Sequence, residues 1–511
     1  MLFRRLEPWS FLLLVALHAA PIVVEPLFPT LDGPSHLNNA RLLRDLWLGH
    51  GRAAEFFAIN PFPEPNLLGD LIMAIAMIVA PAALAEKLVL LLAVAGLAYT
   101  FRTWVRQADP ERPWASFLVL PFLLSVPLFM GFINFCLSLP LMFLVLAEWE
   151  RSIAGATKRG SWRMGVMLLL LYTAHLSTFL LTASILVART VQANRSPSGT
   201  APWRALALAL ALPISLSTTY FLLHAGHAAK PARFPVAELL AWMRDGRAWT
   251  AFAPEAEVPW TRPIAIVLLG LGAAALPLAV KSGPRSLPAF LAVVTMGLAG
   301  LFLLLPDTMA GGSLMTPRLL LFTMLFLTAF SIAARIDGRV LAAGTAVVGI
   351  CSIGHWNTQR GIHHGLCTEL TELMEVAPAV PEGAVLLPLN YGDNWLHSNF
   401  SSYLGAVRGA IALDNFVATA PFSPVRWRKE RMPYAAIGDF DRSDRPCVRI
   451  DGYRADDVPL VDLVLTWKRT DAMTDSCTND ARGQLAGAFR EVAASGGRGA
   501  VLYERTRAIP D

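Results

Sequence analysis

The chain opens with a hydrophobic run and a turn that together set its architecture. Residues 9–28 read WSFLLLVALHAAPIVVEPLF, and Asp32-Gly33-Pro34-Ser35-His36 follows almost directly. About 20 consecutive, mainly apolar residues suffice for one helix across a bilayer, and a Gly-Pro pair favours a turn. The sequence therefore predicts a membrane span that brings a carboxylate and an imidazole to a membrane surface.

Composition extends this interpretation to the whole chain. Of the 511 residues, 55% are hydrophobic and 16% are charged, and the net charge is +5; soluble domains are about one quarter charged. The apolar residues come in long runs, which indicates many spans and not one large core. The arginines cluster between these runs, so they indicate topology and not nucleic-acid binding. The sequence has no Walker A loop, which argues against an ATP-driven transporter.

Hydropathy predicts eleven spans. They are residues 9–28, 88–105, 114–130, 134–150, 163–175, 177–190, 204–222, 263–280, 288–305, 319–334 and 340–354. With the N-terminus in the cytoplasm, the basic residues at the short loops and span ends all fall on the cytoplasmic side, as the positive-inside rule requires. An odd number of spans then puts the C-terminus outside.

Two segments need separate interpretation. Asn66–Ala80 is apolar, but it is short for a span and Pro81 closes it, so we expect an interfacial or re-entrant helix within the first external loop. Residues 163–190 are basic at both ends and too few for two full crossings at 1.5 Å per residue. A hairpin of two short helices that turns near His175 satisfies both facts; one long helix is the alternative.

The end of the last span divides the chain into two domains. Residues 1–354 form the membrane domain, with 29–87 as its first external loop, and residues 355–511 form a soluble domain. Short strand-like runs alternate there with helix-like stretches, which indicates a small α/β domain. The runs are 384–387, 463–466 and 500–503. The predicted fold class is an α-helical polytopic membrane protein with a small extracytoplasmic C-terminal α/β domain. An oxidising compartment outside would allow a Cys447–Cys477 disulfide.

Asp32 and His36 are the candidate catalytic residues. Ser35 suits the N-cap of a helix over 37–48, whose apolar residues recur at helical spacing, so that one face can lie on the membrane. Asp32 can act as a general base on an acceptor hydroxyl or amine, or hold a divalent metal together with His36. The plainer interpretations are a turn or capping residue for Asp32 and a histidine that points at head groups for His36.

Three residues near later spans are candidate substrate-binding residues. His175 lies in an apolar segment, where a titratable group is costly. Arg318 opens a span on the expected outer side, and its guanidinium matches a phosphate in bidentate geometry. Asn134, in the second external turn, suits a sugar hydroxyl. The plainer interpretations are a histidine satisfied by a neighbouring helix, an arginine that snorkels or pairs with Asp307, and an ordinary helix hairpin.

This layout resembles the C superfamily of glycosyltransferases, which includes protein O-mannosyltransferases, aminoarabinose transferases of lipid A and oligosaccharyltransferases. The resemblance covers about residues 1–354, mainly as architecture. Asp32 matches the acidic residue that members carry directly after the first helix, and residues 66–80 look like their non-spanning helix. Arg318 sits where members often place an arginine for the donor phosphate.

Two further positions qualify the resemblance. The short hairpin at His175 is similar to the short fifth and sixth helices of the superfamily. Asn134 stands where many members carry a second acidic residue, so a metal site of several carboxylates is in doubt. The tail contains no oligosaccharyltransferase sequon-reading motif, which argues against protein N-glycosylation.

The resemblance implies a function. It implies an enzyme of the inner membrane that moves one sugar, a hexose or pentose, from a polyprenyl-phosphate donor to a lipid, glycan or protein acceptor on the outer face. Asp32 would deprotonate the acceptor, and Arg318 would bind the leaving phosphate with support from His36 or His175. A divalent metal is the one cofactor considered. The alternatives are a non-catalytic membrane protein that binds or moves a lipid or polymer, and a secondary transporter, which the scarcity of carboxylates in the spans disfavours.

Overall fold

The structure is a computed structural model, and it describes residues 2–62, 64–155, 158–193, 201–224, 232–308, 313–420, 423–433, 446–455 and 458–506. The chain divides into two compact units. Unit 1 comprises Met1–Val24 and Leu90–Ile362, and unit 2 comprises Glu25–Val89 and His363–Asp511. Two helices, α5 (Ala82–Ala108) and α16 (Gly338–Met374), continue unbroken from one unit into the other. Each unit is described by itself.

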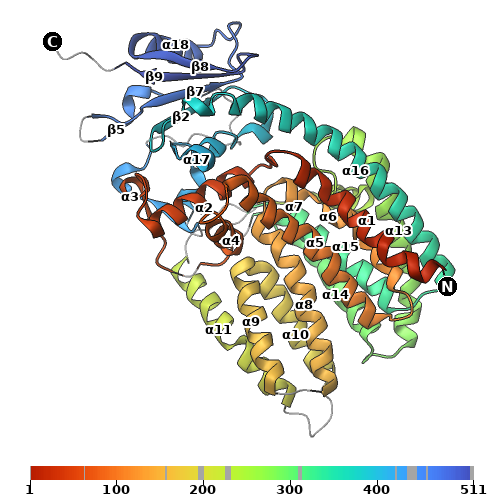
Figure 1. The fold of residues 1–511 in the computed structure, drawn as a ribbon. Coiled ribbons are helices and arrows are strands. Elements are labelled where there is room, and N and C mark those ends of the chain that lie inside the picture. Colours follow the sequence, from red (N-terminus) through yellow and green to blue (C-terminus); the bar gives the residue numbers. More distant parts are fainter. Residues whose placement is uncertain are drawn as a thin grey trace. The chain divides into compact units, whose positions relative to one another are not determined.

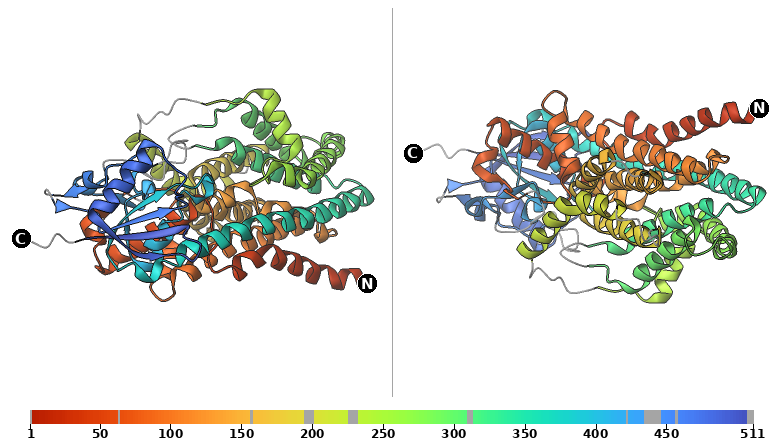
Figure 2. Two further views of the ribbon diagram at one scale, coloured as in Figure 1. Left: turned by 90° about the horizontal axis from the view of Figure 1, so that it is seen from above. Right: turned by 90° about the horizontal axis from the view of Figure 1, so that it is seen from below.

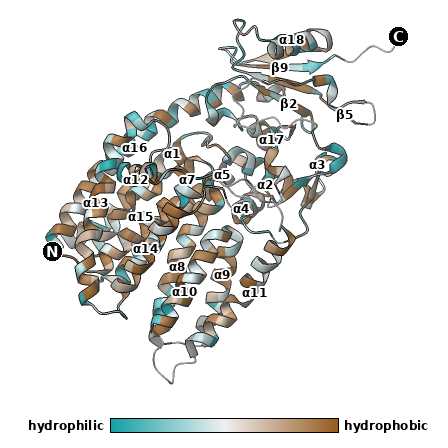
Figure 3. Cartoon of the chain, turned by 180° about the vertical axis from the view of Figure 1, so that it is seen from behind, coloured by the Kyte–Doolittle hydropathy of each residue, from teal (hydrophilic) through white to brown (hydrophobic). Residues whose placement is uncertain are grey.

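Apolar helices dominate the chain. Among the described residues, nine helices are long and apolar enough to cross a membrane, and two shorter apolar helices cover Pro113–Leu123 and Trp162–Ala174. Together these overlap the eleven predicted spans. Figure 3 shows hydrophobic residues along most of α13 (Pro254–Lys281) and α14 (Leu287–Leu304). The predicted class, a polytopic helical membrane protein, is therefore confirmed.

Unit 1 is a helical bundle centred on α15 (Met315–Ala333), which is buried along almost its whole length and packs against α13 and α14 (Figure 1). Its other helices surround this centre. They are α1 (Leu2–Val24), η1 (Pro113–Val119), α6 (Leu120–Leu123), α7 (Val126–Phe129), α8 (Ile133–Gly155), α9 (Lys158–Ala174), α10 (Leu176–Ala193), α11 (Ala201–Leu223) and α12 (Val236–Asp245), with most of α5 and α16.

The span predicted at 114–130 is not one continuous helix. The 3₁₀ helix η1 leads into α6, and the chain leaves helical geometry at Leu124 and Ser125 before α7 begins. Pro121 and Pro127 stand in the first turns of α6 and α7. Because proline lacks an N–H, it starts a helix easily but cannot continue one. The expectation of a single helix was wrong for this physical reason.

The segment predicted as a hairpin is interrupted at its expected turn. Helix α9 ends at Ala174 and α10 starts at Leu176, so His175 alone separates them. Both helices pack against α8 and α11. The structure thus has two shorter helices here and not the single long helix that was the alternative.

Unit 2 joins the first loop to the C-terminal tail. Its helices are α2 (Gly33–Leu48), α3 (Ala53–Phe56), α4 (Leu68–Ala76), α17 (Ser402–Arg408) and α18 (Ser476–Ala488), with the start of α5 and the end of α16. Short 3₁₀ turns lie between them: η2 (Ala377–Ala379), η3 (Trp395–His397), η4 (Phe416–Thr419), η5 (Lys429–Arg431) and η6 (Ile450–Gly452).

A five-stranded sheet forms the core of the tail, in the strand order β3-β2-β7-β9-β8. Strand β2 runs parallel to both β3 and β7, while β9 is antiparallel to β7 and β8. The strands are β2 (Val385–Asn390), β3 (Ile411–Ala412), β7 (Leu463–Trp467), β8 (Phe489–Ala494) and β9 (Ala500–Arg505). Figure 2 shows them side by side. The three strand-like runs of the sequence are β2, β7 and β9, so the α/β character of the tail is confirmed.

Two smaller ribbons complete unit 2. Strand β1 (Phe57–Ile59) pairs with β4 (Val425–Trp427), and β5 (Arg454–Ala455) pairs with β6 (Val458–Pro459). The first ribbon joins the first loop to the tail, and α2 packs against α17 in the same way. Our linear division grouped residues 29–87 with the membrane domain. The structure groups them with the tail, because their strand and helix partners lie there.

The segment Asn66–Ala80 forms a short helix, as expected. Helix α4 has nine residues, which gives a length of about 13.5 Å at 1.5 Å per residue, and it packs against α2. It is too short to cross a membrane.

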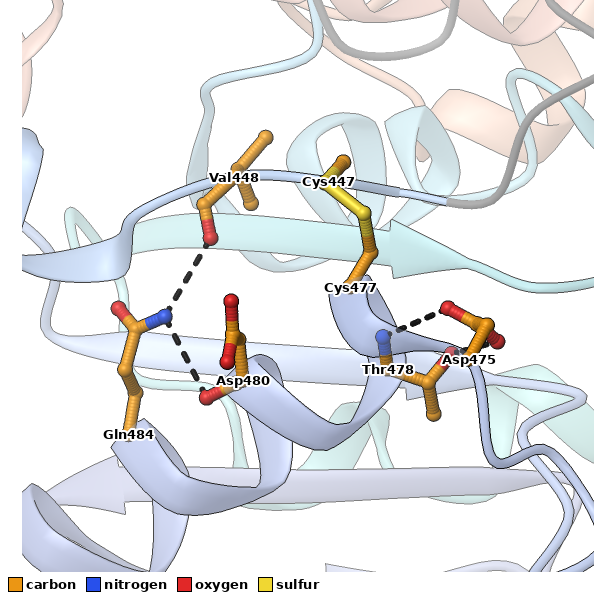
Figure 4. The surroundings of a disulfide bond; sticks show 7 residues. All are labelled: Cys447, Val448, Asp475, Cys477, Thr478, Asp480 and Gln484. Atoms are coloured by element: carbon orange, nitrogen blue, oxygen red, sulfur yellow. Dashed lines mark hydrogen bonds between the residues drawn. A yellow bond between two sulfur atoms is a disulfide. The ribbon is translucent and has the colours of Figure 1, made fainter.

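A disulfide fastens one tail segment to α18. Cys447 and Cys477 are bonded (Figure 4), and Gln484 Nε2 of α18 donates to Val448 O over 3.5 Å. Asp475 caps the helix by accepting the N–H of Thr478 over 2.9 Å. The sequence allowed this bond, and the structure contains it.

Candidate active site

Asp32 stands at the N-terminus of α2. It occupies the N-cap position, with Gly33 and Pro34 in the first turn, and the backbone N–H of His36 donates to Asp32 O over 3.0 Å. We expected Ser35 to cap this helix, which was wrong: the helix begins at Gly33, because proline is well tolerated in a first turn. Ser35 is buried, with its Oγ 3.4 Å from Ser402 Oγ.

Helix α2 does not present an apolar face to the membrane. Leu37, Ala40 and Leu43 are buried inside unit 2, between α4 and α17 (Figure 1). Only Trp47 and Leu48 at its end are exposed among its large apolar residues. The amphipathic expectation failed because the partner surfaces come from distant parts of the chain.

His36 is paired with a buried carboxylate, Asp70 of α4. Its Nδ1 lies 3.0 Å from Asp70 Oδ1, and the side chains are 17% and 0% exposed. Burial lowers the pKa of His36, but the charge of Asp70, the hydrogen bond to it and the charge of Asp32 act in the opposite direction, so the pKa is raised above its ordinary value of 6.5. The charges of Asp70 and Asp32 thus both favour the protonated form of the imidazole.

Hydrogen bonds from the tail fix the chain just before Asp32. Asn399 Nδ2 donates to Leu31 O over 2.8 Å, and His363 Nε2 donates to Pro29 O over 3.0 Å. Side-chain donors hold a backbone carbonyl where no helix or sheet does so. The carboxylate is therefore presented by a loop with a defined conformation.

Glu86 adds a buried anchor to the same loop. It accepts the backbone N–H of Phe28 over 3.1 Å and the hydroxyl of Tyr403 over 2.7 Å. Both side chains are buried, and hydrogen bonds to a buried charged group are among the stronger ones in proteins.

The polar side of α2 is bound to the tail in turn. Asn415 Nδ2 donates to Asn39 Oδ1 over 2.7 Å, and Arg41 Nη1 donates to Gly405 O over 3.2 Å. Arg41 also pairs with Asp45 over 2.7 Å. Buried polar groups need such partners to offset the loss of water, so these contacts fix the rotation of α2 and hence the position of its first turn.

Arg318 lies in a second cluster, in unit 1. The guanidinium stacks on the ring of Phe132 at 4.1 Å and lies 5.9 Å from that of Phe135. Nη1 is 3.8 Å from Met315 Sδ. Nearby, Asp307 Oδ1 accepts the backbone N–H of Thr316 over 2.9 Å. Cation–π contacts keep the guanidinium plane oriented.

His175 and Asn134 belong to the same unit. The His175 ring meets Phe135 edge-on at 5.1 Å, and its Nδ1 lies 3.0 Å from Thr178 Oγ1 and 3.1 Å from Ser177 Oγ. Asn134 is buried in the first turn of α8, directly before Phe135 in the chain. His175 and Arg318 thus both lie against Phe135.

The five candidate residues fall into two groups. Asp32 and His36 lie in unit 2, and Asn134, His175 and Arg318 lie in unit 1. Each group is brought together within its own unit.

Sequence reasoning missed Asp70, the partner of His36. A signal existed: Asp70 is the only ionisable residue in the apolar segment 66–80, and a carboxylate in such surroundings needs a partner. Glu257 was also missed, because α13 begins before the predicted span. It accepts the N–H groups of residues 251–253 and lies 3.1 Å from His355 Nε2. These contacts give it a structural role at the start of α13.

The sequence allowed a divalent metal held by Asp32 and His36. Among the described residues, no group of three or more His, Cys, Asp and Glu side chains is placed to hold a metal ion. Within the part of the chain that the structure describes, Asp32 and His36 thus have no third ligand that would complete a metal site with them.

Comparison with known proteins identifies the fold. No protein-family model and no curated protein matches the sequence. The crystal structure of ArnT from Cupriavidus metallidurans in the apo state matches with a TM-score of 0.53 and 13% identity, over 97% of both chains. The structure of ArnT from the same organism bound to undecaprenyl phosphate matches with a TM-score of 0.51 and 14% identity, over 98% of both. The chain therefore has the same fold as ArnT.

Proposed function

We propose that the protein is a membrane glycosyltransferase that moves a sugar from a polyprenyl-phosphate donor to an acceptor on the outer face of the inner membrane. The supporting observation is the likeness to ArnT along nearly the whole of both chains, one of these structures being bound to undecaprenyl phosphate. An acidic residue on a fixed turn and an arginine in an aromatic cluster supply the two groups that such a reaction needs.

Asp32 is the proposed general base. It removes a proton from the acceptor hydroxyl or amine as the bond to the sugar forms. His36 lies one helical turn further along α2. Asp70 keeps the imidazole oriented through a 3.0 Å contact, so it is a positioning residue for His36.

Arg318 is the proposed ligand for the donor phosphate. Negative charge builds up on this phosphate as the bond to the sugar breaks, and an oriented guanidinium stabilises it. His175 and Asn134 are proposed to contact the donor beside it. Phe132 and Phe135 orient the guanidinium through cation–π contacts.

The disulfide supports the proposed sidedness. Disulfides persist in oxidising compartments and are rare in the cytoplasm, and Cys447–Cys477 lies in unit 2. We therefore propose that unit 2, with Asp32 and His36, faces the periplasm and that the N-terminus is cytoplasmic.

The test compares cells that carry the wild-type gene, the Asp32→Asn variant or no gene. Mass spectrometry of their glycolipids and glycoproteins identifies the product, and the transfer rate is then measured in isolated membranes. Loss of the base should lower the rate by about 10²-fold or more, with unchanged expression and thermal unfolding. Asp393→Asn, at an exposed position of unit 2, is the matched control.

Two outcomes contradict the proposal. A normal product level with Asp32→Asn removes Asp32 from catalysis. Identical glycolipids and glycoproteins with and without the gene favour the alternative, a membrane protein of this fold that binds or moves a lipid or polymer without transferring a sugar.

A further inference from the structure

A basic surface of unit 2 lies outside both candidate clusters. We call it the basic ribbon; it consists of Arg426, Arg428, Lys429 and Arg431 on β4 and η5. Strand β4 pairs with β1 so that Phe57 faces Trp427, and their buried rings lie 4.2 Å apart. Because side chains alternate along a strand, this packing turns Arg426 outward.

The cations of the basic ribbon are available to a ligand. Arg426, Arg428 and Lys429 are exposed, and among the described residues none of the four basic-ribbon side chains forms an ion pair. Arg428 uses its Nε to donate to Ala54 O over 2.7 Å, which fixes the side chain and leaves its terminal N–H groups. Arg431 lies over the ring of Phe56 at 5.9 Å. The ribbon therefore carries four positive charges against the one negative charge of Glu430 within it.

An exposed aliphatic side chain lies beside these charges. Met432, directly after η5, is 52% exposed. Cations beside exposed aliphatic residues are typical of surfaces that rest on a lipid bilayer, where the charges meet phosphates and the apolar groups enter the interface.

We infer that the basic ribbon docks on the anionic phospholipid headgroups of the bilayer surface. Unit 2 is joined to spanning helices through α5 and α16, which continue without a break, so a bilayer is present at high effective concentration. Each cation close to an anionic surface favours the docked state by roughly five-fold. Four such contacts hold a tethered unit on the membrane. This inference is independent of the proposed function.

The test uses the full-length protein in nanodiscs of phosphatidylcholine, with or without about 30% phosphatidylglycerol. Hydrogen–deuterium exchange is followed by mass spectrometry in the peptides that cover residues 57–62 and 423–433. We expect slower exchange in the anionic discs. The double variant R426Q/K429Q should weaken docking roughly 25-fold and abolish the difference between the two lipids.

A matched control separates position from net charge. R490Q/R498Q removes two exposed arginines of the same unit, each paired with a glutamate, and should retain the lipid dependence. Equal exchange in both kinds of disc, or equal loss in both double variants, overturns the inference. Slower exchange in phosphatidylcholine discs on addition of inorganic phosphate alone would also overturn it, since the ribbon would then bind a soluble anion and not the membrane.

Discussion

The charge of Asp70 is expected to stabilise unit 2 through His36. The Asp70 side chain has no exposed surface, the His36 side chain is 17% exposed, and their atoms lie 3.0 Å apart. Asp70→Asn keeps the shape and an oxygen that accepts the N–H of His36, but it removes the charge. A hydrogen bond to a charged group contributes about 1.5–3 kcal/mol and a neutral one about 0.5–1.5 kcal/mol. The variant should therefore lose about 1–2 kcal/mol of unfolding free energy while His36 is protonated.

The raised pKa of His36 sets the pH dependence of this loss. A group whose pKa is higher in the folded chain binds more protons when folded. Its contribution is complete below the unfolded pKa of about 6.5 and is lost as the pH rises through the raised folded pKa. The stability gap between wild type and Asp70→Asn should be largest at about pH 5.5 and should close as the pH rises through the raised pKa of His36.

Thermal unfolding of the purified full-length protein, followed by tryptophan fluorescence across this pH range, measures the gap. Asp393→Asn is the control, because it removes an exposed carboxylate of the same unit and should change little at any pH. Equal unfolding temperatures of wild type and Asp70→Asn at about pH 5.5, or a gap that widens as the pH rises, would refute the assignment of a raised pKa to His36.

Three further predictions concern other contacts. Tyr403→Phe removes the hydroxyl that donates to buried Glu86 and should cost about 1–3 kcal/mol of unfolding free energy; an unchanged thermal midpoint would contradict it. Replacing Cys447 and Cys477 by serine opens a loop with a sequence separation of 30 and should lower the unfolding free energy by about 3–4 kcal/mol. Denaturant unfolding with and without reductant measures this loss. Equal unfolding free energies of the wild type and the serine variant would contradict the loop-closure argument. Arg318→Lys keeps the charge but loses the planar fork. Under the proposed function, binding of undecaprenyl phosphate, measured by native mass spectrometry, should therefore weaken about ten-fold; equal affinity would remove Arg318 from the proposed donor site.

The membrane helices could be predicted from the sequence because the bilayer imposes a simple rule. A spanning helix needs about 20 apolar residues, and runs such as 263–280 and 288–305 obey it. The rule failed at 114–130, where Pro121 and Pro127 interrupt the helix without lowering the hydropathy. Hydropathy averages over a window, whereas a helix ends at single residues.

The division into units could not be predicted in the same way. Strand β1 has three residues, too few for a period of two to be visible. Its partner β4 is more than 360 residues away. Pairing at such a distance depends on the packing of Phe57 on Trp427 and of α2 on α17. No local sequence pattern predicts this packing.

The candidate site shows again that contacts between residues far apart in the sequence cannot be predicted from local patterns. Asp32 and His36 could be found because they stand together after the first span. Asp70 could have been suspected as the only charge in its segment. The roles of Asn399 and Tyr403 could not be predicted, because nothing in the sequence around them indicates the carbonyl and the carboxylate that they contact.

The hydrogen bonds from Asn399, Asn415 and Tyr403 mean that the C-terminal tail helps to position the loop that carries Asp32. Without the tail, Leu31 O and Asn39 lose their side-chain donors, and buried Glu86 loses the hydroxyl of Tyr403. Each loss leaves a polar group that water must satisfy, and water can reach it only if the first loop opens. A chain cut after Ile362, where unit 1 ends, would keep the contact of His355 with Glu257 and would lose the conformation of the loop. The soluble domain is thus required for the geometry of the first loop even if none of its own side chains touches a substrate.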